Sequence, residues 1–312
     1  MYLSAAAGTR PAPHPEHEHL DITVITPLTV SIFYTVCFHL AKDNRTNCFL
    51  PAPHVVYFTG GELNMFFWMM TPFLVYRWIL IASAVIPAIV LLVKVYRADK
   101  LEPESPALIW RLIIGGIIAT FFALVSERLF GALLSSAVPT TSAAYNVILY
   151  FGVVAISEEL SKYVLLKKRT WNNPEFNCQY DGVVYATAVS LGFALWENIS
   201  YVTMYGFTTA LVRAVTAVPG HACFGVFMGV FYSLAKSNDY IGETGKSKLF
   251  SCLAVIVPVL LHGAYDYIAS METRDFSWAF IIFVVVLFAI SFLLVNQMSK
   301  NDRYLSRRPW LR

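Results

Sequence analysis

The chain has 312 residues, of which 57% are hydrophobic and only 14% are charged, and its formal net charge is +3. A soluble domain carries more charge on its surface, so this composition excludes an ordinary water-soluble globular protein. The small net charge provides no basic face for nucleic acid. The five cysteines are scattered and form no Cys-x-x-Cys pair, which argues against a disulfide framework and against a thiolate metal cluster.

The first 75 residues differ in composition from the rest of the chain. Residues 1–19 contain PAPHPEHEH, which is typical of a flexible tail, although alternating His and Glu can also bind a metal weakly. Residues 20–75 are expected to form a first span at 20–40 and then an outer interfacial segment. Phe66, Phe67 and Trp68 in that segment suit the headgroup region of a bilayer.

Long apolar stretches dominate the chain from residue 76 onwards. Residues 78–93 and 278–295 contain no charged residue, as in helices that cross a hydrocarbon layer about 30 Å thick. Helices are expected because backbone polar groups in lipid must be satisfied within the segment. The sequence therefore predicts an all-α fold, a polytopic transmembrane helix bundle of about eight spans. The expected spans are roughly 20–40, 75–95, 107–126, 144–166, 182–204, 209–235, 249–269 and 277–297.

The basic residues predict an orientation in a cell membrane. They gather at 94–111, 167–169, 236–248 and 300–312, and these segments alternate with loops that carry a single basic residue each. Because basic residues stay on the cytoplasmic side, the C-terminus is expected to be cytoplasmic. Residues 76–297 then form the membrane core, and residues 298–312 form a basic cytoplasmic tail.

Ionisable residues inside the expected spans are the main indication of function, because such residues are costly in lipid. Glu158 and Glu159 are adjacent within the span at 144–166. Lys162 lies one turn after Glu158 on the same face and is expected to hold it ionised, whereas Glu159 points about 100° away. The alternative is that this helix ends at the cytoplasmic interface, since Lys167 follows soon after.

Three further sites lie on the next three spans. Glu197, followed by Asn198, lies near the middle of the span at 182–204. His221 follows Pro219, which is expected to interrupt the helix. His262 and Asp266 lie one turn apart, so that the carboxylate can orient the imidazole. Each of these residues could instead make hydrogen bonds between helices. A single polar cavity would explain why all of them fall at similar depths.

These residues stand in an order that resembles the PrsW-type intramembrane proteases. The family motifs EExxK, FxxxE, HxxxG and HxxxD match EELSK at 158–162, FALWE at 193–197, HACFG at 221–225 and HGAYD at 262–266. YRADKLEPE at 96–104 and RAVTAVPGHACFG at 213–225 also resemble the family, as does YDGVVYATAVSLGFALWENISY at 180–201. One departure is Ser190, where the family tends to have glycine.

The resemblance implies an intramembrane endopeptidase that cuts single-span membrane proteins, with anti-sigma factors as the type of substrate known for bacterial members. It also suggests kinship with CAAX-prenyl endopeptidases and bacteriocin-processing membrane proteases. The implied roles are Glu158 as the base that activates water, Glu159 or Glu197 as the group that holds the water or passes the proton on, and His262 with Asp266 as the oxyanion stabiliser. His221 would share that last role, and Lys162 and Asn198 would support the site.

Two alternatives use the same residues. No cofactor is favoured, but zinc bound by Glu159 or Glu197 with His221 and His262 would make the enzyme a metalloprotease. A proton-coupled transporter also places Glu and His inside a membrane, yet transporters often show an inverted repeat and these spans carry four different motifs. A serine or cysteine nucleophile is disfavoured because the chain has no GxSxG motif and Cys223 faces away from His221.

Overall fold

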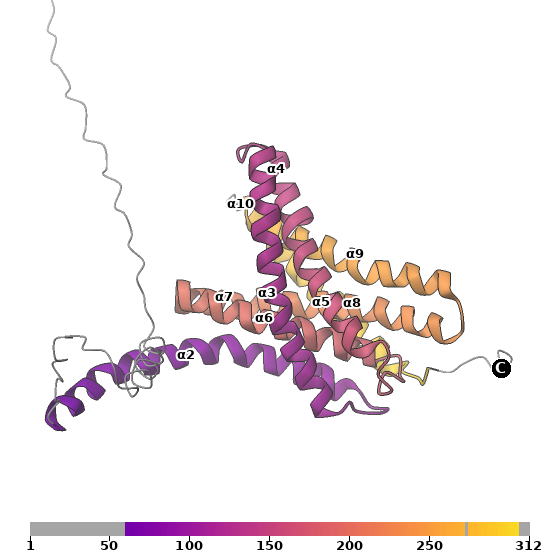
Figure 1. Cartoon of the computed structure of the whole chain (residues 1–312), viewed down its shortest axis with the longest axis horizontal. Helices are drawn as coiled ribbons and strands as arrows, with labels where there is room; N and C mark the ends of the chain where they lie inside the picture. Colours follow the sequence, from indigo (N-terminus) through magenta and orange to yellow (C-terminus); the bar gives the residue numbers. More distant parts are fainter. Residues whose placement is uncertain (1–59, 272–273, 306–312) are drawn as a thin grey trace, which may run out of the picture. The chain divides into compact units, whose positions relative to one another are not determined.

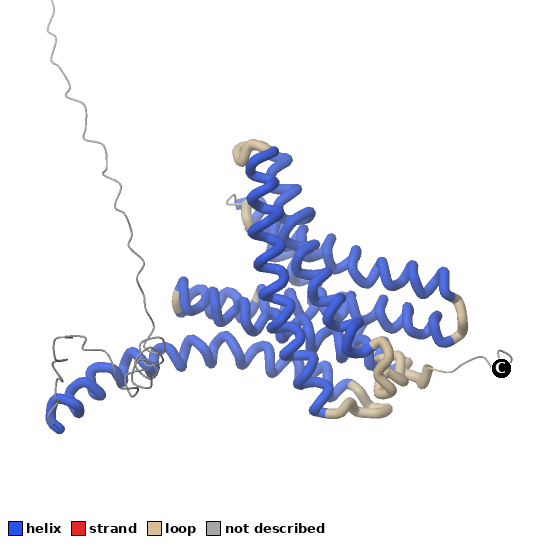
Figure 2. The backbone as a smooth tube through the Cα atoms, viewed as in Figure 1, coloured by secondary structure: helices blue, strands red, loops and turns tan. Residues whose placement is uncertain are grey.

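The computed structural model describes residues 60–271 and 274–305. The expected tail at 1–19 and first span at 20–40 lie outside the described residues. The described chain is helical, as Figure 2 shows, and its one β contact is an isolated bridge between Cys178 and Tyr304. In chain order the elements are α2 Gly60–Ala98, α3 Pro106–Ala137, α4 Ala143–Val147, the π-helix η1 Ile148–Val154, α5 Ala155–Thr170, α6 Asp181–Tyr205, α7 Phe207–Val215, α8 Ala217–Tyr240, α9 Thr244–Ala269 and α10 Arg274–Lys300 (Figure 1).

Helix α6 lies at the centre of the described body and contacts α2, α3, α5, α7 and α8. Every residue from 181 to 194 is buried. Glycines allow this close packing. A Cβ atom on Gly192 would lie 2.2 Å from the backbone oxygen of Ile113 in α3, which is too close for any side chain at this position. On the other face, a Cβ atom on Gly229 of α8 would lie 2.5 Å from the Cα atom of Val183. Backbone therefore contacts backbone on both sides of α6.

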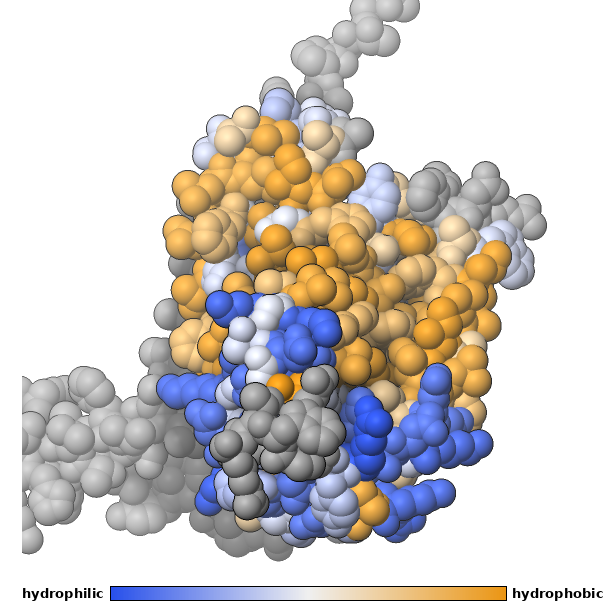
Figure 3. Space-filling view, turned by 90° about the vertical axis from the view of Figure 1, so that its right-hand side faces the viewer, coloured by the Kyte–Doolittle hydropathy of each residue, from blue (hydrophilic) through white to orange (hydrophobic). Residues whose placement is uncertain are grey.

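The described helices have the character of membrane spans. Five are long and apolar enough to cross a bilayer: Met70–Ala98, Pro106–Ala137, Phe207–Tyr240, Thr244–Ala269 and Ser277–Lys300. Figure 3 shows a broad hydrophobic surface above a hydrophilic end of the same body. The prediction of an all-helical, multi-pass membrane protein is thus confirmed for the described residues. The count of about eight spans is not confirmed. The first expected span lies outside the described residues, the segment at 144–166 is divided into short elements, and polar residues lower the hydropathy of the segment at 182–204.

Three segments differ in detail from the sequence-based expectation. Helix α2 begins at Gly60, so part of the expected interfacial segment is continuous with the next span. The expected helix at 144–166 consists of α4, η1 and α5. The expected helix at 209–235 is interrupted at Thr216, and Pro219 lies in the first turn of α8. Proline has no N–H to donate to the backbone carbonyl four residues earlier, and its ring disturbs the preceding turn, so the interruption expected from Pro219 is confirmed and lies three residues before it.

The close contact between α3 and α6 gives a stability prediction. Gly192→Ala is expected to lower the free energy of unfolding in detergent by about 1–3 kcal/mol, because the added methyl meets backbone that cannot shift cheaply. Gly131→Ala in α3 is the matched control, since nothing lies within 4 Å of a Cβ atom at that position. Denaturant unfolding of both variants checks the prediction, and an equal stability of the two would contradict it.

Candidate functional site

Glu158, Glu159 and Lys162 form a buried charge cluster on α5. The Lys162 ammonium lies 2.7 Å from Glu159 Oε1 and 3.1 Å from Glu158 Oε2, and its side chain is fully buried. It also lies 4.0 Å from the centre of the Phe193 ring. The expected contact of Lys162 with Glu158 is therefore present, and Glu159 is a second and closer partner that was not expected. Positions i+3 and i+4 both lie one turn away on a helix, so one long side chain reaches two adjacent carboxylates.

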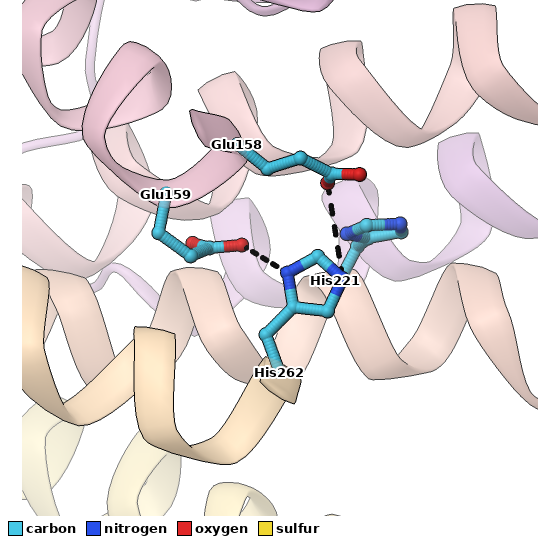
Figure 4. Close-up of side chains that lie close together, drawn as sticks. All are labelled: Glu158, Glu159, His221 and His262. Atoms are coloured by element: carbon cyan, nitrogen blue, oxygen red, sulfur yellow. Dashed lines mark hydrogen bonds and ion pairs between the residues drawn. The ribbon is translucent and has the colours of Figure 1, made fainter. Parts of the chain in front are cut away.

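His262 reaches this cluster from α9. Its Nδ1 atom lies 2.9 Å from Glu159 Oε1, and its Nε2 atom lies 3.8 Å from Glu158 Oε2 (Figure 4). The Oδ2 atom of Asp266 is 3.4 Å from Nε2. The imidazole therefore contacts all three carboxylates, and its shortest contact is with Glu159 rather than with the expected Asp266. Phe224 of α8 stacks on the ring at a centroid distance of 4.8 Å, which fixes the plane of the imidazole.

His221 reaches the cluster from α8, with its ring centre 5.3 Å from that of His262 (Figure 4). Its Nε2 atom lies 2.8 Å from Glu197 Oε2, and its Nδ1 atom lies 3.3 Å from Lys162 Nζ. Ser190 stands where the family tends to have glycine. Its hydroxyl donates a 2.6 Å hydrogen bond to the backbone carbonyl of His221, so this residue helps to pack α6 against α8. The two imidazoles are thus held by carboxylates from different helices.

Two residues near this cluster were not predicted from the sequence. Arg213 of α7 lies 3.1 Å from Glu197 Oε2 and donates a 2.9 Å hydrogen bond to Asn198 Oδ1. Asn198 in turn donates to the backbone carbonyl of Ala84. Glu127 of α3 lies on the wall of the same cavity. Arg213 opens the segment RAVTAVPGHACFG, so a single basic residue in an apolar stretch was the signal that could have indicated it.

These side chains surround a cavity of about 430 Å³. Glu158, Glu197, His221, His262 and Asp266 all lie on its wall, together with Glu127 and Arg213. Glu159 is fully buried behind this wall, and its second carboxylate oxygen has no hydrogen-bond partner. Within the part of the chain that the structure describes, the predicted residues from four separate spans therefore meet in one polar chamber. Their catalytic roles stay predictions.

The same side chains can hold a metal ion. One ligand atom from each of Glu158, Glu159, His221 and His262 lies within 4.8 Å of the others. Two imidazoles and two carboxylates suit zinc, which also accepts the orphaned oxygen of Glu159. The expected metal set included Glu197 in place of Glu158, but Glu197 is paired with His221 and Arg213. The Lys162 ammonium already lies among these ligand atoms, so a metal ion would compete with it for Glu159.

A polar chamber of carboxylates and imidazoles, enclosed in a helical body with five candidate membrane spans, is the kind of site expected of a membrane-embedded enzyme. The model of the PrsW family intramembrane metalloproteases matches residues 103–295. The chain belongs to this family, and the resemblance seen in its motifs is confirmed.

Curated relatives named Protease PrsW agree with this assignment. The relative from Halalkalibacterium halodurans is 31% identical over 72% of this chain and 99% of its own length. Those from Geobacillus kaustophilus and Bacillus subtilis are 31% and 30% identical over 62% and 61% of this chain, and over 81% and 83% of their own lengths. No solved structure matches the chain. The relatives support a peptidase, and the chain is a multi-pass membrane protein.

The buried charge cluster gives a second prediction. Lys162→Met is expected to lower the free energy of unfolding by about 3–5 kcal/mol, because it leaves two adjacent buried carboxylates without their shared counter-charge. Lys168→Met on the same helix is the control, since Lys168 is exposed and surface charges contribute little. Unfolding in detergent measures both variants. A loss at Lys162 no larger than that at Lys168 would show that the ammonium does not hold the pair together.

Proposed function

We propose that the protein is an intramembrane endopeptidase in which Glu158 activates a water molecule to hydrolyse peptide bonds of membrane proteins. The observation that carries this proposal is the cavity of about 430 Å³, because it brings Glu158 together with two imidazoles beside space for a peptide. Of the adjacent carboxylates, Glu158 lies on the cavity wall and Glu159 lies behind it. Glu158 is therefore the better candidate for the base, and Glu159 for a positioning residue.

In the proposed reaction, Glu158 takes a proton from water as the oxygen attacks the peptide carbonyl. The negative charge that forms on the carbonyl oxygen is stabilised by an N–H group of His262, an effect of about 3–4 kcal/mol for one such donor. Glu159 holds His262 at Nδ1, which directs Nε2 toward Glu158 and Asp266. Proton return to the leaving amine would fall to Glu158 or Glu197, since both line the cavity.

Substrate access is proposed to be lateral. A larger groove of about 930 Å³ follows α3 and α5, is lined mainly by apolar side chains, and includes Ser157, next to Glu158 in the chain. Lys168 and Arg169 lie at one end of this groove, and basic residues favour the cytoplasmic side. We propose that a single-span substrate of the anti-sigma-factor type enters there and unwinds locally to expose its peptide bond. The C-terminus of the enzyme would then be cytoplasmic, in a cell membrane.

The proposed mechanism uses no metal ion, because the Lys162 ammonium supplies the positive charge that Glu159 needs. The alternative is the metalloprotease that the family description names. Glu158 or Glu159 with His221 and His262 would then hold zinc, which supplies Lewis acidity and lowers the pKa of a bound water. In that form, Glu197 and Arg213 would still orient His221 from its other nitrogen.

Chelation separates the two forms. The metal-free mechanism predicts that activity survives removal of divalent ions by a strong chelator, and that metal analysis finds far less than one zinc ion per chain. The assay is cleavage by purified enzyme in liposomes, before and after chelation. Zinc that is present at one ion per chain, and that is lost together with activity, would overturn the metal-free mechanism while leaving the peptidase assignment intact.

The role of Glu158 gives a further prediction. Glu158→Gln is expected to lower the rate of peptide cleavage by about 10²–10⁴-fold, because an amide cannot take the proton from water. The measurement uses proteoliposomes that contain a mixed set of single-span peptides, with new termini detected by mass spectrometry. Cys223→Ala is the control and should cleave at the rate of the wild type. Full activity of Glu158→Gln, or loss of activity in Cys223→Ala, would refute the proposed base.

A further inference from the structure

A second buried cluster of carboxylates lies at the end of the body away from the cavity. One ligand oxygen from each of Asp99, Glu104 and Asp181 lies within 4.8 Å of the others, and all three side chains are buried. Asp99 and Glu104 lie in the loop between α2 and α3, and Asp181 is the first residue of α6. Glu197 lies on the same helix roughly 24 Å further along, at about 1.5 Å per residue, so this cluster is separate from the proposed active site.

Three carboxylate oxygens of this cluster, two of Asp99 and one of Asp181, are buried without a well-formed hydrogen bond. Asp99 is only 5% exposed, and neither of its carboxylate oxygens has a well-formed hydrogen bond, although the backbone N–H groups of Leu101 and Glu102 lie near them. Asp181 uses Oδ2 to accept hydrogen bonds from the backbone N–H groups of Asn177 and Cys178, and its buried Oδ1 has no partner. The fully buried Tyr185 hydroxyl lies beside Glu104. Unpaired buried polar groups are costly, and several in one place indicate an unrecorded ligand.

The charge around the cluster is unbalanced. None of its three carboxylates makes an ion pair within the described residues, in contrast to the cluster at Lys162. Asp302 lies close enough to repel Asp99, and its own Oδ2 is buried without a partner. A positive charge is therefore missing from this place.

We propose that Asp99, Glu104 and Asp181 bind a hard divalent cation, of the class of Mg²⁺, Ca²⁺ and Mn²⁺, that ties the start of α6 to the loop between α2 and α3. A set of oxygen ligands alone is typical of this class, whereas zinc prefers the nitrogen atoms of the other cluster. The surrounding contacts fit such a role. Tyr180 donates to the backbone oxygen of Val95 at the end of α2, and its N–H donates to Asp302.

Several segments that are distant in sequence meet at this site. The end of α2, the loop between α5 and α6, and the residues after α10 lie together in Figure 1, and Ser299 donates to the backbone oxygen of Ala98. The isolated bridge between Cys178 and Tyr304 joins the last two of these segments. A cation here would hold these helix ends together, and in the proposed orientation they are the cytoplasmic ends. It would raise the stability of the folded protein and would take no part in the chemistry of the cavity.

Manganese binding tests this proposal. Purified full-length protein in detergent is titrated with Mn²⁺ and followed by electron paramagnetic resonance, with Ca²⁺ and Mg²⁺ as competitors. The variant Glu159→Gln/His262→Ala serves as the background, so that binding at the proposed active site does not contribute. This background is expected to bind one Mn²⁺ ion per chain, and Asp99→Asn within it should weaken binding at least tenfold. Glu102→Gln, an exposed acid of the same loop, is the matched control and should bind as the background does.

Thermal unfolding gives a second and independent measurement. Mn²⁺, Ca²⁺ or Mg²⁺ should raise the unfolding temperature of the wild-type protein by several degrees and should leave that of Asp99→Asn unchanged. The proposal is overturned if the background variant binds no Mn²⁺, if Asp99→Asn binds as tightly as Glu102→Gln, or if none of the three cations changes the unfolding temperature of the wild type. In those cases protons alone neutralise the cluster. None of these outcomes depends on peptidase activity.

Discussion

The contact on which the site depends is the one between the buried Lys162 ammonium and the two adjacent carboxylates of α5. Two buried negative charges side by side are not stable without a positive charge. One ammonium serves both because positions i+3 and i+4 share a turn of the helix. With the pair held, His262 and His221 can approach from α9 and α8 without facing two unbalanced charges.

The second requirement is close packing around α6, which determines where the imidazoles and carboxylates meet. Glycines at the contacts with α3 and α8 let the backbones approach to distances that any larger residue would prevent. Without a hydrophobic driving force between helices in lipid, such contacts and the hydrogen bonds between helices hold the bundle together. The hydrogen bond from Ser190 to the backbone of His221 is one of these, and it fixes α8 against α6 beside the candidate site.

Much of this arrangement could be predicted from the sequence, because ionisable residues in apolar stretches are rare and each must have a partner. That reasoning identified Glu158, Glu197, His221 and His262, and the structure brings all of them to one cavity. The pairing within the cavity could not be predicted. Helical periodicity gives the face of a residue on its own helix, but not the rotation of one helix against another, so Glu159 rather than Asp266 became the closest partner of His262.

The span count and the π-helix mark two further limits of the sequence. The spans at 144–166 and 182–204 were expected from the sequence, but α5 has only 16 residues and polar residues lower the hydropathy of α6, so neither is among the five candidate spans. The π-helix η1 depends on local backbone geometry that leaves no clear signal in the side chains. Such π-helical turns are frequently found at functional sites, and η1 ends only four residues before Glu158, where a wider turn changes the direction of the carboxylates that follow.

The two ends of α6 show how differently one fold can treat buried acids. Near Glu197, Arg213 and His221 provide charge and hydrogen bonds from neighbouring helices, so that the carboxylate is fully engaged. Near Asp181, the neighbouring side chains are again acids, and several of their oxygens are left without partners. Because a protein rarely tolerates unpaired charge where burial is optional, the second arrangement is explained by a ligand from solution. The cation would then supply positive charge to Asp181 at the start of α6, as Arg213 does to Glu197 toward the other end of the helix.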